Sequence, residues 1–194
     1  MYARRRRELG LDSLRPWDVE VDPLGRPALR PFQSTAELEE KCAAIFHRVD
    51  PALGAHYDTL RRENLLDLEN RKNKAPGAYC IVFEQSRRPF IFMNAVGVHD
   101  DVQTLLHETG HAFHGFESAA LPYFRQREVT LEMAEVASMS MELLAAPYLS
   151  GPDGFYSPDE AARARVQHLE FHLSFWPYMA IVDGFQHWAY ENPE

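Results

Sequence analysis

The 194-residue sequence has few cysteines, a deficit of basic residues and no long hydrophobic run. Its two cysteines, Cys42 and Cys80, are too few for a disulfide framework and lack CxxC spacing, so we expect reduced thiols. The net charge of −9 argues against a nucleic-acid partner, which needs a basic surface. No apolar stretch suits a signal peptide or a membrane span. We therefore predict a cytoplasmic protein with neither nucleic acid nor membrane as partner.

The composition itself is that of a globular protein, with 45% hydrophobic and 25% charged residues. A chain of this length can bury one substantial core but hardly two. We therefore expect a single domain over residues 1–194.

Local patterns predict a mainly helical chain. Residues 1–33, with prolines at 16, 23, 27 and 31, predict a short helix and a turn-rich lead-in. Helical spacing of apolar residues, with breaks at turn residues, predicts further helices within 34–66, 100–147 and 157–191. Because proline fits the start of a helix, we expect the last of these segments to be divided at Pro177.

A β-hairpin is predicted over residues 78–97, before the helix that contains the histidines discussed next. The segments AYCIVF and PFIFMNAVG are rich in β-branched and aromatic residues, and EQSRR between them suits a turn. Pro89 cannot donate to a ladder of hydrogen bonds, so the second strand is expected near a sheet edge. The expected fold class is mainly α with a small sheet.

The segment HETGH places His107 and His111 four residues apart in a predicted helix. At 3.6 residues per turn, both imidazoles lie on one face and can reach one metal ion. Glu108 lies at the edge of that face, where a carboxylate can accept a proton from a metal-activated water. The pattern predicts a catalytic zinc site, which needs a third protein ligand.

The spacing leaves the third ligand open. His114 shares the helical face but lies two turns from His107, too far for all three histidines to converge on one ion. A third histidine six residues after His111, as in metzincins, is excluded because Glu117 stands there. The next helix offers Glu132, Glu135 and Glu142, among which spacing alone does not choose.

Longer motifs resemble a known family. TLLHETGHAFH at 104–114 and AEVASMSMELL at 134–144 resemble the thimet oligopeptidase and oligoendopeptidase F family of zinc metallopeptidases. RKNKAPGAYC at 71–80, PFIFMN at 89–94 and DGFQHWAYENP at 183–193 extend the resemblance over most of the chain. It implies a zincin-like α+β fold, one Zn²⁺ per chain and short peptides as substrates.

Matched residue by residue, the resemblance implies His107, His111 and Glu135 as the zinc ligands and Glu108 as the general base. We add hypotheses of supporting roles near the metal for His114 and Glu142. The family also implies that PFIFMNAVG is an edge strand along which a peptide lies. The candidate substrate-binding residues around the hairpin are Gly77, Ala78, Phe92, Met93 and Asn94.

One departure from the family concerns length. Family members are much longer and have tyrosine and histidine residues, beyond the region matched here, that stabilise the oxyanion. Loss of an oxyanion donor costs a factor of about 100 to 1000 in rate. An alternative is therefore a truncated zinc-binding remnant, or a peptide-binding module that self-associates or takes missing cleft walls from a partner chain. A third interpretation, a helical interaction domain that binds no metal, would require every match to the family motifs to be accidental.

Overall fold

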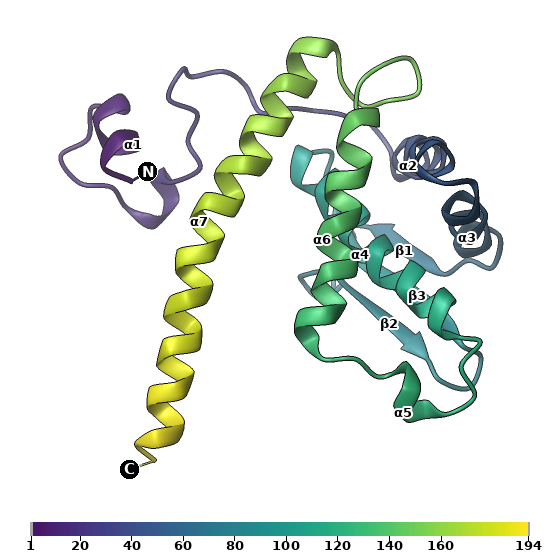
Figure 1. Cartoon of the computed structure of the whole chain (residues 1–194). Coiled ribbons are helices and arrows are strands. Elements are labelled where there is room, and N and C mark those ends of the chain that lie inside the picture. Colours follow the sequence, from purple (N-terminus) through teal and green to yellow (C-terminus); the bar gives the residue numbers. More distant parts are fainter. Residues whose placement is uncertain (1, 194) are drawn as a thin grey trace. The chain divides into compact units, whose positions relative to one another are not determined.

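The computed structural model describes residues 2–193, which form two compact units (Figure 1). One comprises residues 29–161, and the other comprises residues 2–28 with 162–193. Both are mainly helical, and the larger one contains a three-stranded sheet, which confirms the expected fold class. The single domain expected over 1–194 stays a prediction. Among residues 2–193, no helix has the length and apolar character needed to cross a bilayer.

The smaller unit is built on the long helix α7 (Pro158–Glu191), with α1 (Tyr2–Glu8) and a short 3₁₀ helix η1 (Pro16–Asp18). The buried guanidinium of Arg5 donates to the Val21 carbonyl and pairs with Glu170, both at 2.9 Å. Arg163 similarly pairs with Asp22 at 3.1 Å. These bonds attach the lead-in to α7, because a buried guanidinium must have its donors satisfied.

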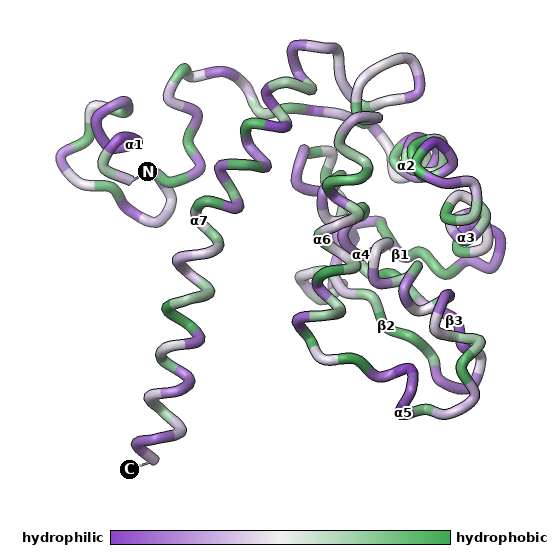
Figure 2. The backbone as a smooth tube through the Cα atoms, in the orientation of Figure 1, coloured by the Kyte–Doolittle hydropathy of each residue, from purple (hydrophilic) through white to green (hydrophobic). Residues whose placement is uncertain are grey.

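Helix α7 corrects one prediction. The expected division at Pro177 is wrong, because the helix continues through that residue. A proline inside a helix removes one main-chain hydrogen bond and strains the preceding turn, which a long helix can accommodate. Hydrophobic and hydrophilic residues alternate irregularly along α7 (Figure 2), so the sequence has no single apolar stripe there.

The larger unit begins with two packed helices, α2 (Thr35–Val49) and α3 (Pro51–Arg62). Ser34 caps α2 by accepting a hydrogen bond from the Glu37 amide at 3.2 Å. The Asp50 carboxylate accepts from the Ala52 amide at 2.7 Å and so caps α3. Both caps satisfy main-chain donors that a helix leaves unpaired at its first turn.

The sheet consists of β1 (Leu66–Glu69), β2 (Tyr79–Phe83) and β3 (Arg88–Ala95), in the order β1-β3-β2. The predicted hairpin is confirmed as the antiparallel pair β2–β3. The expected edge position of β3 is wrong, because β1 pairs with its other side in parallel. Pro89 fits this central strand because pairing with β1 begins only opposite Ile91, so no donor is needed from residue 89 on that side.

The remaining helices of the larger unit pack onto one face of the sheet through α4. Helix α4 (His99–Ser118) contacts β2 and β3, and α6 (Leu131–Ala145) packs against α4 (Figure 1). The short helix α5 (Phe124–Arg127) lies between α4 and α6 in the sequence, and the 3₁₀ helix η2 (Ala146–Tyr148) follows α6. Alternate residues of β3 are buried beneath α4, as strand geometry requires. The fully buried core includes Leu38, Ile45, Phe46, Tyr57, Leu60, Ile91, Leu105 and Leu106.

Candidate metal centre and active site

Two histidines of α4 form one side of the site. His107 and His111 are one turn apart, and their ring centroids lie 5.0 Å from each other with the planes at 85°. Both side chains are partly exposed, at 27% and 20%. Two imidazoles at this separation can direct one nitrogen each to a common point.

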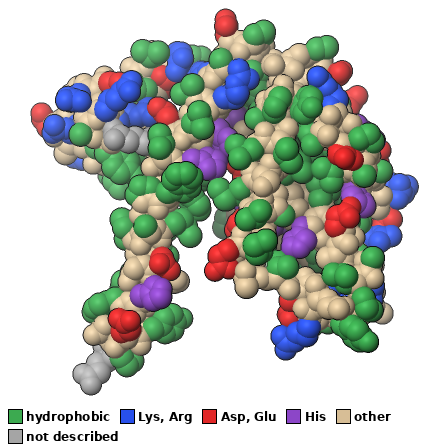
Figure 3. Space-filling model, in the orientation of Figure 1, with side chains coloured by type: hydrophobic (Ala, Val, Ile, Leu, Met, Phe, Trp, Pro, Cys, Tyr) green, Lys and Arg blue, Asp and Glu red, His purple; other side chains and the backbone are tan. Residues whose placement is uncertain are grey.

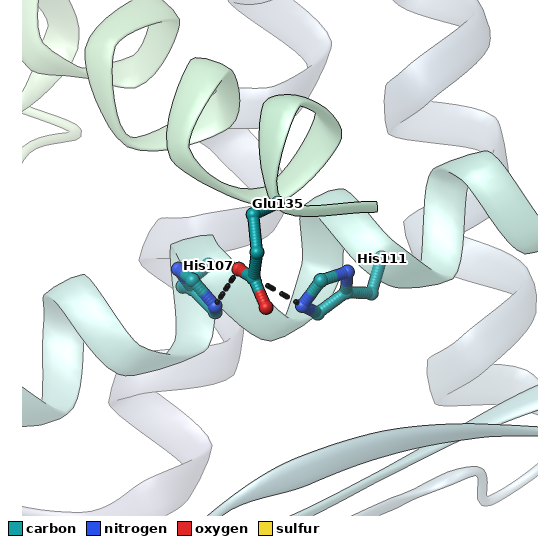
Figure 4. A group of neighbouring side chains, drawn as sticks. All are labelled: His107, His111 and Glu135. Atoms are coloured by element: carbon teal, nitrogen blue, oxygen red, sulfur yellow. Dashed lines mark ion pairs between the residues drawn. The ribbon is translucent and has the colours of Figure 1, made fainter. Parts of the chain in front are cut away.

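Glu135 of α6 completes a group of three (Figure 4). Its Oε2 lies 3.2 Å from Nε2 of His107 and 3.7 Å from Nε2 of His111. Donors about 2.0–2.2 Å from a tetrahedral Zn²⁺ are separated by about 3.3–3.6 Å. The two distances from Glu135 are close to this range, and all three donor atoms lie within 4.8 Å of one another, so the group could hold one ion. The donor set of two imidazoles and one carboxylate is that of a catalytic zinc, which keeps a fourth position open.

Close packing of α4 on α6 brings Glu135 to the histidines. A Cβ built on Gly110 would lie 2.6 Å from both the carbonyl oxygen of Ala137 and Cα of Ser138. Only glycine permits such an approach between two helix backbones. Gly110 stands between the two histidines in HETGH, so this close contact of the helices lies at the site.

Gly110→Ala is therefore expected to force the helices apart. We expect a loss of about 1–3 kcal/mol in the free energy of unfolding, as for other overpacked cores, together with weaker zinc binding. Urea denaturation and a competitive zinc titration measure the two effects. The control is Gly184→Ala in α7, where a Cβ meets no atom within 4 Å. Unchanged stability and zinc affinity in Gly110→Ala would contradict this account.

Glu142 lies behind His107. Its Oε1 is 2.7 Å from Nδ1 of His107, which leaves Nε2 directed at Glu135. Burial lowers the pKa of His107, but the hydrogen bond and charge of Glu142 outweigh it, and the pKa is raised above its ordinary value. For His111, burial dominates and lowers the pKa. A carboxylate behind a ligating histidine fixes its tautomer and orientation.

Ser138 is a neighbour that sequence reasoning missed. Its buried hydroxyl lies 2.7 Å from Oε2 of Glu135, the oxygen that faces the histidines, and 3.0 Å from the Glu135 carbonyl. The hydroxyl can therefore donate to the carboxylate and orient it. The only signal in the sequence was that Ser138 follows Glu135 by three residues, which places the two side chains on one face of a helix. A serine at this spacing is common, so it does not by itself indicate a supporting role.

Glu108 lies beside the edge strand. Its side chain is buried, and the Cys80 amide of β2 donates a hydrogen bond to its carboxylate. Burial raises the pKa of Glu108, and the neighbouring His107 only partly offsets this. A raised carboxyl pKa suits a group that must both accept and return a proton near neutral pH.

The other residues predicted from the sequence are His114, near the metal ligands, and the residues around the hairpin. His114 lies close enough to His111 for its charge to lower the pKa of that imidazole. Phe92 stacks on Tyr79 on the outer face of the sheet, with centroids 4.9 Å apart, whereas Met93 is buried on the inner face. The residues around Gly77 and Ala78 precede β2, and Asn94 donates to the carbonyls of Ala75 and Gly77. These hairpin residues are not among the group formed by His107, His111 and Glu135.

With this geometry established, similarity to known proteins identifies the family. Peptidase family M3 matches the chain over residues 1–194. The chain belongs to peptidase family M3. This confirms the resemblance to oligoendopeptidase F. The structure of PZ peptidase A with inhibitor 2 superposes with a TM-score of 0.86 at 34% identity, covering 99% of this chain and 33% of that one.

Two proteins similar in sequence to this chain are named as oligopeptidases. The chain is 28% identical over 151 residues to oligopeptidase PepF of Bacillus subtilis (strain 168), which covers 76% of this chain and 22% of that protein. It is 29% identical over 143 residues to group B oligopeptidase PepB of Streptococcus agalactiae serotype III (strain NEM316), with 71% and 22% covered. The chain thus spans about a fifth of the length of these relatives.

Proposed function

We propose that this chain is the catalytic segment of a zinc metalloendopeptidase that hydrolyses peptide bonds in short oligopeptides. The observation that supports this most is the convergence of His107, His111 and Glu135 on one point, with Glu108 beside it. Membership of family M3 and the oligopeptidase relatives support the peptidase class.

One Zn²⁺ held by His107, His111 and Glu135 would polarise the scissile carbonyl and lower the pKa of the attacking water. Glu108 accepts a proton from that water and transfers it to the leaving amine. Glu142 and Ser138 support the site by holding one imidazole and the ligating carboxylate in orientation.

The substrate peptide would lie along β2 rather than β3. Among the described residues, no strand pairs with the side of β2 that faces away from β3. The Cys80 amide donates to Glu108, and alternate residues of a strand direct their main-chain groups to the same side, so Val82 also faces the open edge. A peptide added there by main-chain hydrogen bonds would pass close to Glu108 and the metal ligands.

Two measurements on the purified full chain test the proposal. The first is zinc stoichiometry after metal loading and dialysis, for which we expect one ion per chain. The second is cleavage of an internally quenched fluorescent peptide, which we expect to stop with a chelator and to resume when zinc is restored. Zinc uptake without cleavage would favour the alternative of a metal-binding module with little turnover. No zinc uptake would exclude both.

Zinc affinity is expected to fall as the pH falls from about 8 to about 5, because protons compete with the metal for the imidazoles. Glu142 raises the pKa of His107, so competition begins at higher pH than for an ordinary histidine. A competitive titration at several pH values measures this dependence. Glu142→Gln should shift the fall in affinity to lower pH. An affinity that does not change with pH would contradict the assignment of histidine ligands.

We also propose that this chain associates with another protein chain. Hydrophobic side chains gather at the surface around α6 (Figure 3). The most exposed hydrophobic side chains on α6 belong to Leu131, Met133, Val136, Leu143 and Leu144. Exposed apolar surface of this kind favours contact with further protein, from a second copy or from a partner that supplies cleft walls. Sedimentation velocity at several concentrations tests for self-association.

A further inference from the structure

Lys74 is a buried cation in the segment 70–78, which joins β1 to β2. Its side chain is only 2% exposed. Its Nζ lies 2.5–3.0 Å from four oxygens, which are the main-chain carbonyls of Asp67, Glu69 and Met93 and one carboxylate oxygen of Asp67. A buried ammonium needs partners for all its donors. This side chain therefore ties the segment to both β1 and β3.

Asn94 of β3 fixes the same segment at a second point. Its Nδ2 donates to the carbonyl of Ala75 at 2.8 Å and to that of Gly77 at 3.1 Å. Gly77 has a φ of +97°, in the region that favours glycine. Lys74 and Asn94 thus hold the chain immediately before it enters β2.

The start of β2 in turn lies at the active site. Cys80, the second residue of the strand, donates its amide to Glu108. We propose that Lys74 is a positioning residue for peptide binding, which holds the segment 70–78 so that the open edge of β2 starts beside Glu108. This inference rests on the proposed function, because it assumes that a peptide occupies that edge. The ammonium of Lys74 itself hydrogen-bonds to β1 and β3, and its Nζ lies 4.4 Å from the centroid of the Phe92 ring of β3.

Hydrogen exchange tests the structural step. In Lys74→Met, which keeps an unbranched stem but loses the ammonium, we expect the amides of Tyr79 and Cys80, which are hydrogen-bonded at the start of β2, to exchange at least about tenfold faster. Local opening there no longer requires the bonds of Lys74 to break. Exchange in α4 and α6 should stay within about twofold of the parent. The matched control is Arg71→Gln. Arg71 also pairs with Asp67, but its side chain is 52% exposed, and its removal should leave exchange at Tyr79 and Cys80 unchanged.

Peptide binding tests the functional step. The zinc-loaded Glu108→Gln chain allows a fluorescent octapeptide to bind without cleavage. Adding Lys74→Met should raise the peptide Kd about tenfold while zinc affinity changes less than about twofold. In Lys74→Ala, n-propylammonium replaces the deleted atoms and should restore both slow exchange and peptide affinity. Tetramethylammonium, a cation without N–H donors, should restore neither.

Each outcome decides the inference. Unchanged exchange at Tyr79 and Cys80 of Lys74→Met would overturn it. Faster exchange throughout α4 and α6 with loss of zinc would also overturn it, since Lys74 would then support the fold as a whole. Faster exchange at Tyr79 and Cys80 with normal peptide affinity would show that the segment does not position a peptide, and would also overturn the inference. Failure of the proposed function is separate: the parent chain itself would then take up no zinc.

Discussion

Glu108→Gln is expected to lower kcat/KM for peptide hydrolysis by about 10²–10⁴-fold, because an amide cannot accept and return a proton. The substitution keeps the shape of the side chain and an oxygen that can accept from the Cys80 amide. Zinc content should therefore stay at the parent level, since Glu108 is not one of the three ligands. Initial rates with a quenched fluorescent peptide, measured beside zinc content on the same preparation, test this prediction.

The control for Glu108→Gln is Glu132→Gln. Glu132 is exposed on α6, and the carboxylate paired with the two histidines is Glu135. The variant should therefore cleave at the parent rate. Equal rates in the parent and in Glu108→Gln would mean that a contaminating peptidase causes the cleavage. A Glu108→Gln variant that has lost its zinc would instead give Glu108 a role in metal binding.

Glu135→Ala is expected to weaken zinc binding by about 100- to 1000-fold. The free energy of zinc binding at structural sites is roughly 10–16 kcal/mol and comes from three or four ligands, so the loss of one ligand removes a large part of it. Removal of the carboxylate also leaves His107 and His111 without the anion that lies 3.2 Å and 3.7 Å from their Nε2 atoms. A competitive titration with a chromophoric chelator measures the change. Peptide cleavage should fall in parallel at limiting zinc.

Two further variants make this prediction specific. Glu132→Ala removes a neighbouring carboxylate of the same helix and should leave zinc affinity unchanged. Ser138→Ala removes the hydroxyl 2.7 Å from the Glu135 carboxylate and should weaken zinc binding by about tenfold, as loss of such supporting contacts usually does. Comparable losses in Glu132→Ala and Glu135→Ala would show that Glu135 is the wrong carboxylate.

Local sequence patterns predicted most helices and the hairpin because these elements are set by neighbouring residues. Strand β1 was missed because its four residues are too few to show a period. Its pairing with β3 also joins segments about 25 residues apart, so it depends on the folded chain. The same contact decides which strand is the edge, and Pro89 gave the wrong indication since it pairs with β2 but lies just before the part of β3 that pairs with β1.

The sequence by itself determined the family and the pair of histidines, since four residues of helix place His107 and His111 on one face whatever surrounds them. Spacing did not select a third ligand, and Glu135 was matched only through the resemblance. The tertiary structure decided that Glu135 is the carboxylate that faces both imidazoles, whereas Glu142 lies behind His107, because this depends on how closely α6 approaches α4 at Gly110. It also decided that β2 presents the open edge, because the order of strands is fixed by pairing between distant segments, which no local pattern encodes.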